Sequence, residues 1–329
     1  MRNLKKFLAL VLAVMMAASL MVTANAAITT DPAMTDSDKV TEEFKEAVAV
    51  LNGLKIITGY EDGSFQPQKD ISRQETTALV YRLHSGDVAD AKKDLYSTAD
   101  NIKQFTDVNR EGAQQWSAGY IGYCANQGII KGVSDTRFAP ASKVTGYQVL
   151  AMVLRAIGYG QNKEYEGSGW QTRVATTATQ LGILKNVNNT NYSATLSGSA
   201  TRELVAEIIF QAALQDTVTY TAGLGYVKTG STSLVGGTLG SLSTKNFNLK
   251  SGNYQVIDGW GRPGYKWYSG DTAIATITAT PAKEYDTAVR ECDVAHDLGF
   301  DGSRTYSLFV NSNKAITDNY LIVATDTVT

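Results

Sequence analysis

The sequence predicts an α-helical body of three repeated helix–loop–helix units, followed by a small β-rich domain. The main observation is a recurrence, because several residues of one unit reappear 73 positions further along the chain. These are Gly59, Phe65, Pro67, Ser72 and Arg82, matched by Gly132, Phe138, Pro140, Thr145 and Arg155. A third, weaker copy follows after a further 54 to 56 positions, at Asn186, Tyr192 and Thr201. Repeats that each carry an apolar face bury those faces against one another, so three copies predict one shared core.

Each unit is predicted to contain two helices joined by a loop. In the first unit, apolar residues recur at helical spacing over Phe44–Leu51, which predicts an amphipathic helix. Ser72 then caps a second helix and, with a glutamate three positions later, forms a capping box. Thr145 has the same role in the second unit, with Gln148 completing the box. Thr201 starts the second helix of the third unit, where the box is missing, and 186–197 before it is predicted to be a loop.

The pattern changes after Asp216, where helical spacing disappears. Short runs rich in threonine, valine, isoleucine and tyrosine alternate with glycine turns, which is typical of strands. The predicted strands include Tyr254–Ile257, Ala273–Thr280 and Tyr306–Val310. Residues 224–329 are therefore predicted to form an independent β-rich domain.

The first 26 residues have the pattern of a secretory signal peptide. A charged start precedes an apolar run over Phe7–Val22, and Ala24–Ala26 forms an Ala-x-Ala cleavage site. A transmembrane anchor is the alternative, but the run is short for a span and small residues follow it. The sequence thus predicts an exported chain without a membrane-spanning segment after cleavage.

Charge and cysteine content restrict the function further. The chain has 30 basic and 32 acidic residues, and the predicted signal peptide removes only basic ones. This balance argues against a nucleic-acid partner, which requires a basic stripe. Cys124 and Cys292 are too few for a disulfide framework. Cys124 is predicted to be a buried small apolar residue, with a Cys124–Cys292 bridge as the less favoured alternative.

Signals for an enzyme are weak. The chain lacks the Gly-x-Ser-x-Gly, His-Glu-x-x-His and P-loop patterns, and its two histidines lie in different predicted domains. Asp62-Gly63 is predicted to be a turn and not a calcium loop, so we expect no metal and no cofactor. Carboxylates gather in the last domain, which leaves a hydrolase as the alternative function. They are Asp286, Glu291, Asp293, Asp297 and Asp301, and a solvated acidic face is the favoured interpretation.

The repeat motifs resemble the S-layer homology (SLH) domain. The motifs are Gly59–Pro67, Ile71–Glu75, Phe105–Val108, Trp116 and Gly128–Gly132. The resemblance covers 40–216 and divides it into units 40–86, 105–160 and 168–216. It implies a non-catalytic pseudo-trimer with pseudo-three-fold symmetry that binds an anionic secondary cell-wall polysaccharide, acidic or pyruvylated. It also implies a place in the cell wall or surface layer of a bacterium, with self-assembly as a further option.

Two arginines are the strongest candidates for binding. Arg73 and Arg202 directly follow the cap residues Ser72 and Thr201, so each guanidinium starts a helix. The resemblance implies that this arginine contacts the wall polymer. The alternative is a salt bridge between repeats, for instance with Glu75 or Glu203. In the second unit the corresponding position is Gly146, which puts that site in doubt.

Four other residues complete the predicted polysaccharide site with these arginines and caps. Trp116 and Trp170 lie at the start of the second and third units. They are expected to form the floor of sugar-binding grooves between the units. The alternative is that both tryptophans anchor helices in the core. Gly59 and Asp62 of the first loop are included as loop residues of the site.

The function predicted from the sequence is non-covalent anchoring of an exported protein to the cell wall. The C-terminal domain would then be cargo, such as a surface-layer, adhesion or spacer element. The alternatives are a wall-anchored hydrolase whose last domain is catalytic, and a spacer whose repeats have lost binding.

Overall fold

The computed structural model describes most of the chain from Ala26 onward. The described ranges are 26–30, 34–102, 104–109, 111–187, 192–229, 240–253, 255–256, 263–279, 283–285, 305–310 and 320–325. The predicted signal peptide lies outside them except for its last residue, and so do Cys292, His296 and the acidic residues 286–301. The chain divides into two units, one made of 29–251 and 267–275 and the other of the remaining segments.

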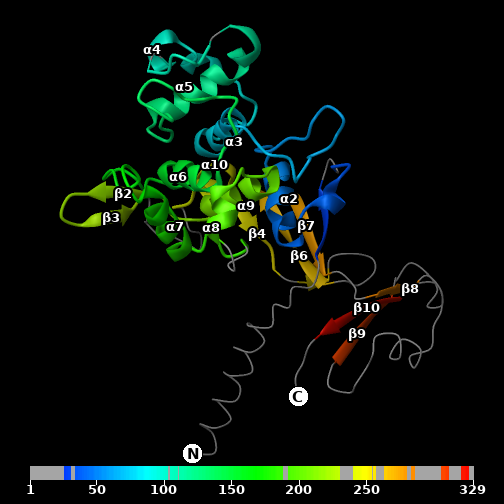
Figure 1. Ribbon diagram of the computed structural model, residues 1–329. Helices are drawn as coiled ribbons and strands as arrows, with labels where there is room; N and C mark the ends of the chain where they lie inside the picture. The colour runs from blue at the N-terminus through cyan, green and yellow to red at the C-terminus, as the bar shows by residue number, and fades with distance from the viewer. Residues whose placement is uncertain are drawn as a thin grey trace, which may run out of the picture. The chain divides into compact units, whose positions relative to one another are not determined.

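The larger unit is built mainly from helices (Figure 1). The two helices of the first predicted repeat are α2 and α3, those of the second are α5 and α6, and those of the third are α7 and α9. Their bounds are α2 Lys45–Gly53, α3 Arg73–Ser85, α5 Ala118–Asn126, α6 Gly146–Ala156, α7 Trp170–Gln180 and α9 Arg202–Ala213. Shorter pieces lie between them: η1 Ser37–Lys39, η2 Glu42–Phe44, η3 Lys93–Tyr96, α4 Ala99–Ile102, η4 Gly112–Ser117 and α8 Tyr192–Ser197.

The capping predictions are confirmed at all three second helices. The Ser72 hydroxyl accepts from the Glu75 N–H, and the Glu75 carboxylate accepts in return from the Ser72 N–H at 2.8 Å. Thr145 and Gln148 form the same reciprocal box at the start of α6. Thr201 accepts from the N–H three residues on at 3.3 Å, without the returning bond. These side chains satisfy backbone donors that a helix start leaves free, and so set where each helix begins.

The helices of one repeat do not pack mainly against each other. The second helices α3, α6 and α9 contact one another. The first helix of each repeat packs on the second helix of another repeat: α5 on α3, α7 on α6, and α2 on α9. The chain therefore closes on itself, because the first helix of the first repeat covers the last helix of the third. The spacing of the repeats predicted a shared core but not this exchange of partners.

Three backbone hydrogen bonds close a ring where the loops enter the second helices. The Ile71 N–H donates to the Ala200 carbonyl at 3.1 Å, and the Ala200 N–H donates to the Val144 carbonyl at 2.8 Å. The Val144 N–H returns to the Ile71 carbonyl at 3.2 Å. Each repeat contributes one residue, so the three segments hold one another in register.

The core lies between these helices and the loops. Phe65 and Phe138 occupy matching places in the first and second loops and are 1% and 0% exposed. Cys124 is buried with a free thiol, and burial raises its thiol pKa. This confirms its role as a small apolar residue. Within the described part of the chain no helix is long and apolar enough to cross a bilayer.

The third loop differs from the prediction. Residues that the sequence analysis assigned to a loop form helix α8 up to Ser197, and Leu196 of this helix is fully buried. The segment lacks the proline that both other loops carry, Pro67 and Pro140, and the Asp-Gly turn of the first loop, so neither of these helix breakers is present in it.

Segments beyond the repeats complete the larger unit. Strands β2 (Val218–Thr221) and β3 (Gly225–Lys228) form an antiparallel hairpin, and α10 (Leu242–Phe247) packs on α3. Strands β4 (Leu249–Ser251), β6 (Pro263–Ser269) and β7 (Thr272–Ala279) are neighbours in that order. Trp267 donates to the Glu46 carboxylate at 2.7 Å and packs on Phe210. Residues 224–229, 240–251 and 267–275 thus belong with the helices, although the sequence analysis assigned them to a separate C-terminal domain.

The other unit is β-rich in its described residues. Strands β8 (Lys283–Tyr285), β10 (Tyr320–Thr325) and β9 (Thr305–Val310) form an antiparallel sheet in that order. Tyr320 pairs with both Tyr285 and Val310. Strand β5 (Gln255–Val256) pairs with the start of β6, and β1 covers Ala26–Thr30. The predicted strands near 254, 273 and 306 are confirmed by β5, β7 and β9.

Candidate functional site

Arg73 joins the first repeat to the loop of the second. Its Nε donates to the Phe138 carbonyl at 2.8 Å and its Nη2 to the Lys131 carbonyl at 3.0 Å. The guanidinium lies 4.6 Å from the centre of the Phe138 ring, and the residue is only 3% exposed. Burial lowers the pKa of Arg73 to about 10, so the side chain still carries its charge at neutral pH. The residue is a buried clamp between two repeats.

Arg202 makes the same kind of contacts as Arg73, but from the third repeat to the loop of the first. Its Nε donates to the Phe65 carbonyl at 2.7 Å and its Nη2 to the Thr58 carbonyl at 3.4 Å. Its guanidinium lies over the rings of Phe65 and Tyr60, at 5.0 and 4.7 Å. Arg202 is half-buried, so it is more accessible than Arg73. It joins the third repeat to the loop of the first.

Arg73 and Arg202 thus link repeats, as the salt-bridge alternative predicted. Their partners, however, are backbone carbonyls and not carboxylates. Glu75 completes the cap of α3, and Glu203 accepts bonds from the first repeat. Neither Arg73 nor Arg202 lines either of the two cavities described below. Contact between these arginines and a wall polymer stays a prediction.

Gly146 is explained by the third loop. A Cβ atom placed on Gly146 would lie 2.8 Å from Leu196 Cδ2 and 2.9 Å from Leu196 Cα. Helix α8 therefore packs directly on the start of α6, where the other two loops receive an arginine. The missing guanidinium and the altered loop are two parts of one local change.

We expect Gly146→Ala to lower the free energy of unfolding by about 2 kcal/mol, because overpacking displaces both Leu196 and its backbone. Thermal or urea unfolding of the exported chain measures this. Gly198→Ala is the matched control, since its Cβ would meet only the Ala194 carbonyl, at 3.6 Å. A Gly146→Ala protein as stable as the control would show that α8 moves away without cost.

Asp36 and Asp107 hold the loops in place, a role that the sequence analysis did not assign. Asp36 accepts from the backbone N–H groups of Phe65 and Gln66 at 2.7 and 2.8 Å. Asp107 accepts from those of Phe138 and Ala139, both at 2.8 Å. Gln66 and Ala139 both have φ near +60°, a conformation that costs a non-glycine residue free energy. A Thr-Asp pair stands near the start of the first and second repeats, at Thr35-Asp36 and Thr106-Asp107, and it was the available signal.

Gly59 and Asp62 shape the first loop. A Cβ atom on Gly59 would lie 2.9 Å from the Ser64 carbonyl, which explains the glycine. The Asp62 carboxylate accepts from the N–H and hydroxyl of Ser64 at 2.9 and 2.7 Å. These bonds, led by the side-chain bond from Ser64, lower the pKa of Asp62. Asp62 therefore closes a turn, and no group of three or more potential metal ligands gathers among the described residues.

The two tryptophans are neither core residues nor cavity walls. Trp116 is 41% exposed and touches Tyr120 edge to face. Trp170 is half-buried and packs edge to face on Tyr147. Their exposure leaves room for a sugar ring, yet neither lines the two described cavities. Their part in binding stays a prediction.

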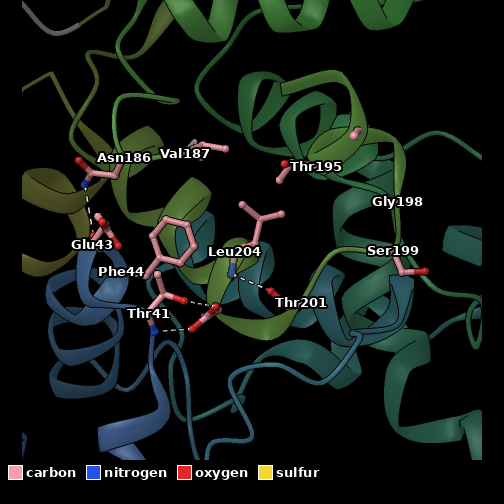
Figure 2. Close-up of a pocket in the computed structure, with 12 residues that line it drawn as sticks. Thr41, Glu43, Phe44, Asn186, Val187, Thr195, Gly198, Ser199, Thr201 and Leu204 are labelled. Atoms are coloured by element: carbon pink, nitrogen blue, oxygen red, sulfur yellow. Dashed lines mark hydrogen bonds between the residues drawn. The ribbon is translucent and has the colours of Figure 1, made fainter. Parts of the chain in front are cut away.

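The first cavity lies at the seam between the first and third repeats and has a volume of about 620 Å³. Figure 2 shows the apolar side chains of Phe44 and Leu204 in its middle and the side chains of Thr195 and Ser199 to one side. The described residues that line it include two carboxylates, Glu43 and Glu203, and no lysine, arginine or histidine. Such a lining suits neutral hydroxyl groups and repels an anion.

Glu203 ties the seam together beside this cavity. It is 3% exposed and accepts from the Thr41 N–H at 2.8 Å and the Thr41 hydroxyl at 2.6 Å. The Gln68 amide donates to it at 2.7 Å. The sequence analysis named Glu203 as a salt-bridge partner for an arginine. Its partners are instead Thr41 and Gln68, so this carboxylate links the third repeat to the first.

Glu207 lies one turn further along α9 and is 1% exposed. Asn186 donates to its Oε1 at 3.0 Å, while its Oε2 is buried without a hydrogen-bond partner. Burial raises the pKa of Glu207 to about 7, and hydrogen bonds from Gln211 and Asn186 only partly oppose this effect. A carboxyl group that titrates near neutral pH thus lies inside the body formed by the repeats.

Two segments of the chain match the family model of the S-layer homology domain, at residues 33–77 and 104–149. They include the loops and helix starts of the first two predicted repeats. The described helices and antiparallel strands agree in outline with a helical SLH region followed by a β-rich part.

Several relatives of the chain are surface proteins of bacteria. The chain is 29% identical to the surface layer protein of Brevibacillus choshinensis over 45% of its own length and 12% of that protein. It is 28% identical to the middle cell wall protein of Brevibacillus brevis over 46% of its length and 13% of that protein. It is also 26% identical to the cellulosome-anchoring protein of Acetivibrio thermocellus, over 35% and 24% of the two chains. The chain thus spans less than a quarter of these relatives, and the matches indicate a location at the cell wall or surface.

Proposed function

We propose that residues 40–216 anchor the exported chain to the cell wall by binding an anionic secondary cell-wall polysaccharide, acidic or pyruvylated. The proposal treats all three repeats as SLH units arranged with pseudo-three-fold symmetry. The observation that carries it is the closed ring of Ile71, Val144 and Ala200, in which the third repeat takes the same place as the two matched ones. The role is non-catalytic, and the segments beyond the repeats are cargo or assembly elements.

The predicted site residues divide into two roles in this proposal. Arg73 and Arg202 position the loops of the neighbouring repeats, since their hydrogen bonds go to loop carbonyls. Direct contact with sugar falls to exposed groups, and among the large apolar side chains exposed in the described part of the chain Trp116 is the aromatic one. Aromatic faces beside a few polar groups are typical of ligand sites.

A wall pull-down tests the anchoring function. We expect the chain from Ala27 onward to sediment with purified bacterial walls, and to stay in solution when the secondary polysaccharide has been stripped from them. Sedimentation that is unchanged by stripping would contradict the proposal. Trp116→Ala is expected to reduce the bound fraction severalfold, whereas Leu224→Ala, at a residue 77% exposed in the β2–β3 hairpin, serves as the matched control.

A further inference from the structure

A second cavity, with a volume of about 520 Å³, lies where α6 ends. One wall comes from the second repeat and the residues that follow it, and the other from the β2–β3 hairpin and α10. The hairpin is firmly seated, because the Val218 N–H donates to the Ile157 carbonyl at 2.9 Å. A Cβ atom on Gly158 would collide with the Val218 carbonyl, so this glycine permits the close approach. Residues outside the repeats thus complete this cavity.

The lining of the second cavity is cationic. Four basic residues of the described chain line it: Lys131, Arg155, Lys163 and Lys245. Glu166 is the single carboxylate among the lining residues that the structure describes. His84 also lines the cavity, but burial and then the charge of Lys245 lower its pKa, so it is neutral at neutral pH. The cations therefore outnumber the one anion.

The arginine is fixed and the lysines are free to adapt. Arg155 stands in the last turn of α6, half-buried, with Nη2 donating to the Tyr165 carbonyl at 3.2 Å. Lys131 pairs with Glu166 at 3.5 Å, but both side chains are largely exposed, at 58% and 42%, so the pair is weak. Lys163 and Lys245 are exposed at the cavity. A fixed cation with exposed cations around it suits a ligand of opposite charge.

We propose that this cavity binds a carboxylate or phosphate group of an anionic wall polymer, through Arg155, Lys163 and Lys245. The proposal rests on the proposed function in so far as the polymer belongs to the wall. It assigns the acidic group to the second cavity, because the first one is lined by carboxylates and repels it. Of the four cations, only Lys131 lies in a segment that matches the SLH family model. The other three lie outside the matched segments, with Arg155 near the end of the second repeat and Lys163 and Lys245 beyond it.

Charge reversal at two exposed lysines tests the site. We expect Lys163→Glu with Lys245→Glu, in the chain from Ala27 onward, to weaken binding to polygalacturonate or poly(glycerol phosphate) at least tenfold at low salt. The first polymer carries carboxylates and the second phosphates, so the two arms identify the preferred group, and dextran is the neutral control. Lys39→Glu with Lys92→Glu is the matched variant, since it changes the net charge equally at exposed lysines outside the cavity. It should lower affinity less than twofold.

The outcomes separate this inference from the anchoring function. Equal weakening by both double variants, or no binding of either charged polymer, would overturn the cavity as a site. Polysaccharide-dependent wall retention that survives Lys163→Glu with Lys245→Glu would also overturn it, while leaving the anchoring function in place. Polymer binding that is lost in this variant, together with wall retention that is independent of polysaccharide, would support the cavity and contradict the anchoring function.

Discussion

Arg73→Ala is expected to lower the free energy of unfolding by about 3 kcal/mol or more. The substitution removes two hydrogen bonds from a charged group and leaves the carbonyls of Phe138 and Lys131 without that partner in a buried seam. Hydrogen bonds to charged groups are each worth about 1.5–3 kcal/mol. Contact with the Phe138 ring is lost as well. Urea unfolding followed by circular dichroism measures the loss.

Arg137→Ala is the control for this result. Its side chain is 66% exposed and lies 3.7 Å from Asp107, so this ion pair should contribute at most about 1 kcal/mol. Similar losses in the two variants would show that Arg73 does not clamp the repeats. The result also bears on binding experiments, because a chain that loses wall retention through Arg73→Ala must first be shown to be folded.

Glu207→Gln is expected to stabilise the protein above neutral pH by about 3 kcal/mol. The pKa of Glu207 rises from an ordinary value of 4.5 in the unfolded chain to about 7 in the folded one, chiefly through burial. The folded state therefore binds the proton more tightly. The contribution of Glu207 to stability is fully present below pH 4.5, decreases as the pH rises toward 7 and is lost above it. The glutamine variant lacks this decrease.

Unfolding measured at pH 5 and at pH 8 in both proteins tests this prediction. The difference between variant and wild type should appear at pH 8 and be small at pH 5. Lys185 and Glu46 are the charged groups that act on Glu207, and both are kept in the variant. Glu43→Gln, at an exposed side chain on the same seam, is the control and should shift neither value. An equal gain at both pH values would point to packing and not to titration.

Local features of the fold could be predicted from the sequence because local chemistry decides them. Ser72 and Thr145 have the oxygen that a helix start needs, and a partner three residues on completes each box. The exchange of helix partners could not be predicted, since an apolar stripe shows that a face is buried but not which helix covers it. Helix α8 was missed because the third copy was interpreted by analogy with the loops of the other two.

The candidate site was only partly predictable for a related reason. The position of Arg73 after a cap placed it correctly at a helix start, but its acceptors are carbonyls 58 and 65 residues away. Only the tertiary fold brings those oxygens within reach. Similarly, Lys163 and Lys245 of the second cavity belong to no repeat motif, and the hairpin that closes the cavity lies beyond the repeats.

The ring of Ile71, Val144 and Ala200 has a consequence for biogenesis. A chain that crosses the membrane from its N-terminus delivers Ile71 long before Ala200, which supplies the acceptor for the Ile71 N–H. The interval is longer still for Thr41, because its partner Glu203 lies 162 residues downstream. The first repeat therefore emerges incomplete and can be finished only when the third has been translocated. Chaperones or proteases at the outer face of the membrane would therefore encounter a partly folded first repeat. In a chain truncated before Ala200, the first repeat would remain partly folded.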